Sequence, residues 1–178
     1  MLRRPLLLLA LVALLAAAAA GASAAATPGE HVGAAATKRI TPSGVGAVKL
    51  GATYRKLRAA GLVGRLRRGC ELAGPKQRFA RLKAPLRGTA DFTTSKPRRV
   101  KTITVAGGAT ARGVGVGDSE ADIRAAFPKA KFDHGTDDTF GITVVRVPRS
   151  DGGRLQFALG TKSDEVELIA LPRLAFCE

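Results

Sequence analysis

The chain has 178 residues, a formal net charge of +15, two histidines, two cysteines and no tryptophan. So few histidines and cysteines leave little material for a catalytic triad or a metal site, and an aromatic content of 4% argues against nucleic-acid binding by base stacking. These counts favour a non-enzymatic protein with no catalytic residues, no bound metal and no cofactor.

The chain begins with the pattern of a secretory signal peptide. Arg3 and Arg4 precede an apolar run over residues 6–20, and Ala22-Ser23-Ala24 fits the A-x-A site of signal peptidase. We therefore expect residues 1–24 to be removed and the protein to be secreted or located in the cell envelope. An uncleaved membrane anchor is the alternative, since the apolar run approaches the ~20 residues that span a bilayer.

The segment after the signal peptide, residues 25–39, lacks hydrophobic periodicity, which predicts a flexible leader. Beyond it, residues 48–60 and 114–126 show the same pattern 66 positions apart: a short alternating stretch, a glycine, a hydroxyl residue and a segment ending in Leu/Ile-Arg-Ala-Ala. Thr53 and Ser119 stand where a side chain can cap a helix. The repeat predicts two related units, each with a strand, a glycine turn and a short helix.

The first unit is expected over residues 40–108 and the second over residues 109–178, with Gly107-Gly108 as the joint. Ser150-Asp151-Gly152-Gly153 predicts a hairpin turn in the second unit. Short helices need a sheet to pack on, so the predicted fold is α+β, with two tandem units that each pack a short helix on a small antiparallel sheet. The predicted strands are residues 79–82, 88–93 and 100–105 in the first unit and residues 142–147, 155–159 and 166–171 in the second.

Two cysteines in an exported protein predict one structural disulfide, Cys70 to Cys177, which would tie the end of the second unit to the first. Two free thiols or a bridge between molecules are the alternatives. Metal binding by these cysteines is not expected, because neither has a nearby Cys or His at ligand spacing.

The repeated motif resembles the tandem repeats of the secreted β-lactamase inhibitor protein family and the related SmpA/OmlA outer-membrane lipoproteins. The resemblance is carried by residues 45–60 and 114–128, and it implies helices packed on one antiparallel sheet whose other face binds a partner. Two features depart from the pattern. No cysteine for lipidation follows the apolar run, and the aromatic anchors that inhibitors use at interfaces are scarce.

Charge is unevenly distributed along the chain. Residues 38–112 hold 19 Lys and Arg against two acidic residues, whereas residues 113–178 hold 8 basic and 11 acidic residues. Clustered positive charge steers anionic partners, although a GC-rich coding sequence would also produce many solvated arginines. The segregation of the acidic residues favours the first interpretation. The predicted anion- and partner-binding residues are Arg65, Arg67, Arg68, Lys96, Arg98, Arg99 and Lys101.

The sequence thus favours a monomeric, secreted, non-enzymatic binding module for an anionic or acidic partner. Candidate partners are a protein, an anionic cell-envelope polymer or a membrane surface, where each basic residue contributes roughly 1 kcal/mol. Export argues against nucleic acid as the partner. The alternative function is a protein inhibitor of a secreted hydrolase.

Two further motifs carry less chemistry. His134 is the one histidine outside the leader, so an enzymatic role would have to use it as the base. Asp133, Asp137 and Asp138 surround it without the spacing of a calcium loop, which indicates a solvated turn. The alternating glycines of residues 113–117 belong to the repeated turn, because a nucleotide-binding loop requires a βαβ unit.

Overall fold

The computed structural model describes residues 37–69, 76–148 and 154–175, which belong to one compact unit. The predicted signal peptide, most of the predicted leader, the predicted hairpin turn, Cys70 and Cys177 lie outside the described residues. None of the described helices is long and apolar enough to cross a bilayer.

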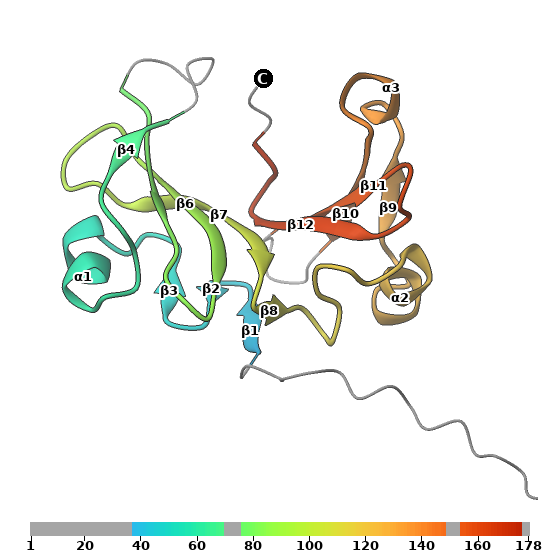
Figure 1. The fold of residues 1–178 in the computed structure, drawn as a ribbon, viewed down its shortest axis with the longest axis horizontal. Coiled ribbons are helices and arrows are strands. Elements are labelled where there is room, and N and C mark those ends of the chain that lie inside the picture. The colour runs from blue at the N-terminus through green and yellow to red at the C-terminus, as the bar shows by residue number, and fades with distance from the viewer. Residues whose placement is uncertain (1–36, 70–75, 149–153, 176–178) are drawn as a thin grey trace, which may run out of the picture. The chain divides into compact units, whose positions relative to one another are not determined.

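The largest element is an antiparallel sheet of eight strands (Figure 1). Its two central strands, β7 (Val100–Gly107) and β12 (Val166–Leu171), pair with each other. Strands from residues before β7 continue the sheet on one side, and strands from between β7 and β12 continue it on the other, in the order β4-β5-β6-β7-β12-β11-β10-β9. The outer strands are β4 (Arg67–Arg68), β5 (Arg78–Arg81), β6 (Arg87–Phe92), β9 (Lys131–Asp133), β10 (Ile142–Pro148) and β11 (Arg154–Gly160).

A second sheet has four short strands in the order β3-β2-β1-β8. Its strand β1 pairs in parallel with β8, and the other pairs are antiparallel. β1 begins within the predicted leader, so the chain is already ordered at Lys38. The bounds are β1 (Lys38–Thr41), β2 (Gly44–Val45), β3 (Val48–Lys49) and β8 (Ala109–Thr110).

The two predicted helices are present as α1 (Tyr54–Ala59) and α2 (Glu120–Ala126), and the described residues add one further turn, α3 (Asp137–Phe140). Thr53 caps α1 by accepting a hydrogen bond from the Lys56 amide. Ser119 caps α2 and forms the reciprocal capping box with Asp122. The local prediction of capped short helices is therefore confirmed.

The repeat is also preserved in the hydrogen bonds that anchor each helix to the sheet. The Gly51 amide donates to the Val100 carbonyl at 2.8 Å, and the Val100 amide donates to Ala52 at 2.9 Å. The second copy has the same two bonds 66 residues later, from Gly117 to Val166 at 2.9 Å and from Val166 to Asp118 at 2.8 Å. Each helix is thus fixed to the first residue of a central strand by the same pair of bonds.

The prediction of two equal helix-on-sheet units is wrong. The fold is mostly β, with one eight-stranded sheet that crosses the expected joint and a four-stranded mixed sheet built largely from the first half. In separate units, β7 and β12 would each expose a row of unpaired backbone donors and acceptors at a sheet edge. Pairing the two strands satisfies those groups and merges the sheets.

The main core lies on the face of the large sheet that α1 and α2 cover (Figure 1). Leu57 of α1 is 2% exposed and Ile123 of α2 is fully buried. An aromatic pair also packs at each helix, but the two pairs do not match by the 66-residue offset: Tyr54 packs edge-on against Phe92, and Phe127 packs against Phe157, at centroid distances of 5.4 and 5.5 Å. A smaller apolar cluster on the opposite face contains Val144, Ala158, Ala170 and Leu174.

Candidate functional site

The predicted basic residues come from two segments, residues 65–68 and 96–101, and strand pairing places Arg68 at the end of the large sheet where the second segment begins. Arg68 lies opposite Arg78, and Arg78 lies opposite Phe92, which is in turn opposite Val100. The loop from β6 to β7, residues 93–99, begins just beyond this row. Since neighbouring strands are about 4.8 Å apart, β4 and β7 are separated by roughly 15 Å. We call the seven residues Arg65, Arg67, Arg68, Lys96, Arg98, Arg99 and Lys101 the basic cluster.

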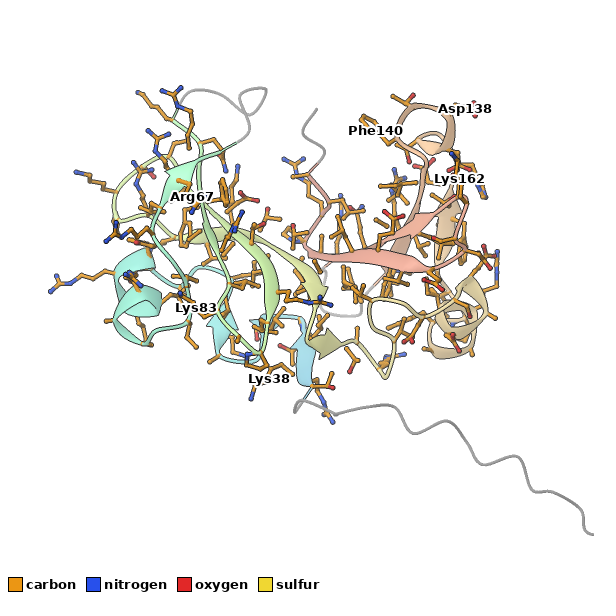
Figure 2. All side chains as sticks on the ribbon, in the orientation of Figure 1. Lys38, Arg67, Lys83, Asp138, Phe140 and Lys162 are labelled. Carbon is orange, nitrogen blue, oxygen red and sulfur yellow. The ribbon has the colours of Figure 1, made fainter. Side chains whose placement is uncertain are left out.

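Four members of the basic cluster are exposed and form no side-chain hydrogen bond or ion pair with a described residue: Arg65, Arg67, Arg68 and Lys96. Figure 2 shows Arg67 on β4, at the edge of the sheet. Because no carboxylate among the described residues neutralises these side chains, their charge is available to attract an external anion.

The other three members support the fold as well as adding charge. The Arg99 guanidinium donates to the Gly51 carbonyl at 3.0 Å, and the Arg98 guanidinium is 3.5 Å from the Thr93 carbonyl oxygen. Arg99 therefore connects the β6–β7 loop to the turn before α1. The sequence offered no sign of these roles, because the acceptors are backbone carbonyls.

Lys101 belongs to a half-buried polar group that the sequence did not predict. Its ammonium donates to the Gln77 side-chain oxygen at 2.9 Å, and Gln77 is only 4% exposed. Asp91 completes the group, and burial raises its pKa more than the Lys101 charge and the Gln77 hydrogen bond lower it. Lys101 is thus positioned by an internal carboxyl and amide rather than held free for a ligand.

Ion pairs within the described residues are confined to the second half of the chain. They are Arg124–Glu120, His134–Asp137 and Arg146–Asp133. No ion pair joins two described residues of the first half, so its excess of positive charge is not compensated among them. This difference follows directly from the scarcity of acidic residues in the first half.

His134 belongs to a group of hydrogen-bonded side chains that connects the turn around α3 to β10. Its Nδ1 lies 2.9 Å from Asp137 Oδ2, while the Thr143 hydroxyl donates to Asp137 Oδ1 at 2.8 Å. A nucleophile activated by imidazole requires the imidazole between the hydroxyl and the carboxylate. In this protein the Asp137 carboxylate contacts both the imidazole and the Thr143 hydroxyl, and the same Nδ1 also lies 3.5 Å from that hydroxyl, so the imidazole is not placed between the two. Partial desolvation acts to raise the pKa of Asp137. The hydrogen bonds from His134 and Thr143, together with the His134 charge, outweigh it and lower that pKa.

Within the described ranges, no three His, Cys, Asp or Glu side chains are placed to hold a metal ion. The predicted disulfide residues, Cys70 and Cys177, are not among the described residues. Comparisons with protein-family models, with curated proteins and with solved structures found no match.

Proposed function

We propose that this protein is a secreted, non-enzymatic binding module whose basic cluster engages an anionic polymer of the cell envelope. The observation that carries the proposal is the set of four exposed cations on or just before β4 and in the β6–β7 loop, with no neutralising partner among the described residues: Arg65, Arg67, Arg68 and Lys96. Several uncompensated charges at one place raise the local potential and increase the rate of encounter with anions.

A polymer is favoured over a compact acidic protein because the cluster is spread over about three strand spacings and none of its seven members is aromatic, although the half-buried Phe79 lies opposite Arg67. Each cation can contact a successive phosphate or carboxylate along a chain. Interfaces between proteins instead concentrate their energy in a few buried aromatic or arginine side chains. The proposed contacts are exposed, so the affinity should fall steeply with ionic strength.

The test uses a poly(glycerol phosphate) chain and a fourfold charge reversal, Arg65→Glu, Arg67→Glu, Arg68→Glu and Lys96→Glu. The matched control reverses four other exposed cations, Lys38, Lys83, Lys131 and Lys162, and so lowers the net charge by the same amount. Figure 2 shows three of these control positions, Lys38, Lys83 and Lys162, away from Arg67. Binding is measured by titration at low and at physiological ionic strength.

The proposal predicts that the cluster variant loses most of its affinity while the control keeps most of it. Equal losses in the two variants would mean that total charge, and not the basic cluster, determines binding. A stoichiometric complex with a secreted hydrolase that survives reversal of the four cations would instead support the alternative function, inhibition of such an enzyme.

A further inference from the structure

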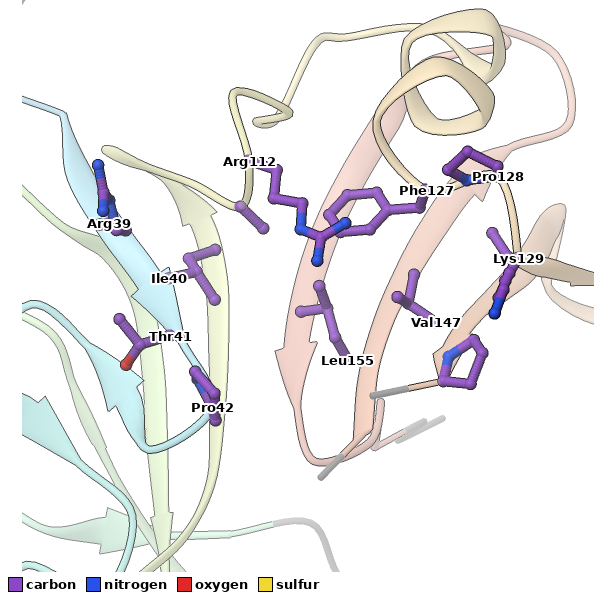
Figure 3. Close-up of a pocket in the computed structure, with 13 residues that line it drawn as sticks. Arg39, Ile40, Thr41, Pro42, Arg112, Phe127, Pro128, Lys129, Val147 and Leu155 are labelled. Atoms are coloured by element: carbon purple, nitrogen blue, oxygen red, sulfur yellow. The ribbon is translucent and has the colours of Figure 1, made fainter. Parts of the chain in front are cut away.

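A groove of about 720 Å³ lies beside the end of α2, between β1 and the paired strands β10 and β11 (Figure 3). Sites for small molecules have volumes of about 300–1,000 Å³, and this groove falls within that range. Ile40 contributes an apolar side chain on the β1 side, and Phe127 and Leu155 contribute apolar side chains on the other. The groove is therefore large enough for a ligand with an apolar body.

Among the described residues that line the groove, every charged one is a cation. Arg39, Arg112 and Lys129 are all exposed, and no described carboxylate lines the groove. Arg39 and Arg112 belong to the basic half of the chain, whereas Lys129 comes from the half in which acidic residues outnumber basic ones. The groove thus gathers cations from both halves of the chain.

The Arg112 side chain lies across the groove (Figure 3). Its guanidinium carbon is 5.4 Å from the centre of the Phe127 ring, and one nitrogen is 3.5 Å from the Ala126 carbonyl oxygen. A guanidinium has five N–H donors, and the other donors of Arg112 have no described partner. A planar fork of this kind suits a carboxylate or a similar oxyanion.

The backbone at Arg112 shows that the turn does not require an arginine. Arg112 has a φ of 50° and Gly113 has a φ of 91°, a pair of left-handed residues for which Asn-Gly or Gly-Gly is preferred. The equivalent position 66 residues earlier is Gly46, with a φ of 53°. The first copy thus fills the left-handed position with the residue that adopts it freely, whereas the second copy places an arginine there despite the strain.

We propose that the groove binds a small amphiphilic anion, a carboxylate with an alkyl chain. Arg112 pairs with the carboxylate, Arg39 and Lys129 add electrostatic attraction, and the chain lies against Ile40, Phe127 and Leu155. The proposal is independent of the basic cluster, because none of the seven cluster residues lines the groove.

The test is calorimetric titration of the protein with dodecanoate below its critical micelle concentration. Saturable binding at one site is expected, and Arg112→Gly should weaken it at least about tenfold, since a charge-assisted contact is lost. The same variant should keep or raise the thermal midpoint, because glycine relieves the left-handed strain. A lower affinity therefore cannot be ascribed to misfolding.

Three controls separate the contributions. Acetate carries the charge without the chain and dodecyltrimethylammonium carries the chain with the opposite charge, so neither should bind with comparable affinity. The fourfold charge reversal of the basic cluster should leave dodecanoate binding intact. The proposal is overturned if the wild-type protein shows no saturable binding, if Arg112→Gly binds equally well, if the cationic amphiphile binds as tightly, or if the cluster variant loses binding.

Discussion

Thr104 and Ala170 lie opposite each other where β7 meets β12, and they are also the same position in the two copies of the repeat, 66 residues apart. The flanking pairs are Ile103 with Leu171 and Val105 with Ile169. By the same 66-residue offset Ile103 corresponds to Ile169 and Val105 to Leu171, so each flanking pair is equivalent to the other. The two halves of the large sheet are thus related by a local two-fold axis at the Thr104–Ala170 pair. The contact between them is self-complementary, as in a symmetric dimer.

This shared sheet predicts that the two halves unfold together. Leu57→Ala in α1 and Ile123→Ala in α2 each remove a buried side chain, and each should cost about 2–5 kcal/mol of unfolding free energy. Urea denaturation followed by circular dichroism should show one transition, shifted by both changes. Two transitions, each moved by only one of the substitutions, would show that the halves are independent units.

The two helix caps should differ in strength. Ser119 accepts from the Asp122 amide and Asp122 accepts from the Ser119 amide, whereas the Thr53 side chain accepts one bond, from Lys56 at 3.3 Å. We expect Ser119→Ala to cost about 1 kcal/mol and Thr53→Ala to cost less. Hydrogen bonds from Ser119 lower the pKa of Asp122, so an NMR titration of Ser119→Ala should also show that pKa rise. Equal costs for the two substitutions would contradict the difference in capping.

Asp91 should make stability decrease as the pH rises. Burial raises its pKa in the folded state, so the folded protein binds more protons than the unfolded chain between the ordinary carboxyl range and the raised value. The contribution of Asp91 is therefore most favourable below that window and is lost above it. Asp91→Asn should therefore remove this fall in the free energy of unfolding. The difference between the free energies of unfolding at acid and at neutral pH should be smaller in the variant than in the wild-type protein.

The neighbouring Lys101 provides a second measurement of the same group. Its charge lowers the pKa of Asp91, and its ammonium donates to Gln77. Lys101→Gln should therefore raise the pKa of Asp91 further, as measured by NMR titration of its carboxyl carbon. An unchanged pKa would show that Lys101 and Asp91 do not interact in solution.

The two glycines before the helices should tolerate alanine equally poorly. Gly51 has a φ of 77° and Gly117 has a φ of 94°, and an added Cβ would meet no atom within 4 Å at either position. The cost of Gly51→Ala and of Gly117→Ala is then the left-handed backbone alone, roughly 1–2 kcal/mol. Thermal denaturation should give similar losses, and a large difference would mean that the two turns are not equivalent.

Much of the local structure could be predicted from sequence because it depends on nearby residues. The strand predicted over residues 166–171 coincides with β12, and the expected caps at Thr53 and Ser119 are present. The merging of the sheets could not be predicted in this way. It depends on pairing between β7 and β12, whose residues are distant in sequence and carry no local signal for one another.

The same distinction applies to the basic cluster. Arg65, Arg67 and Arg68 are exposed, as expected for a charged segment, but Lys101 is engaged by Gln77 and Arg99 by the Gly51 carbonyl. Those partners come from other strands and turns. The sequence also did not point to the role proposed for Arg112, and the signal that could have suggested it is the arginine that takes the place of Gly46 in the second copy of the turn.

The separation of charge between the two halves has an orientational consequence. An excess of positive charge on one half and of negative charge on the other gives the molecule an electric dipole along the large sheet. Near an anionic surface this dipole exerts a torque, which acts within the Debye length of about 8 Å at physiological ionic strength. The protein would arrive with β4 and the β6–β7 loop foremost, leaving the strands β9 and β10 directed away from the surface.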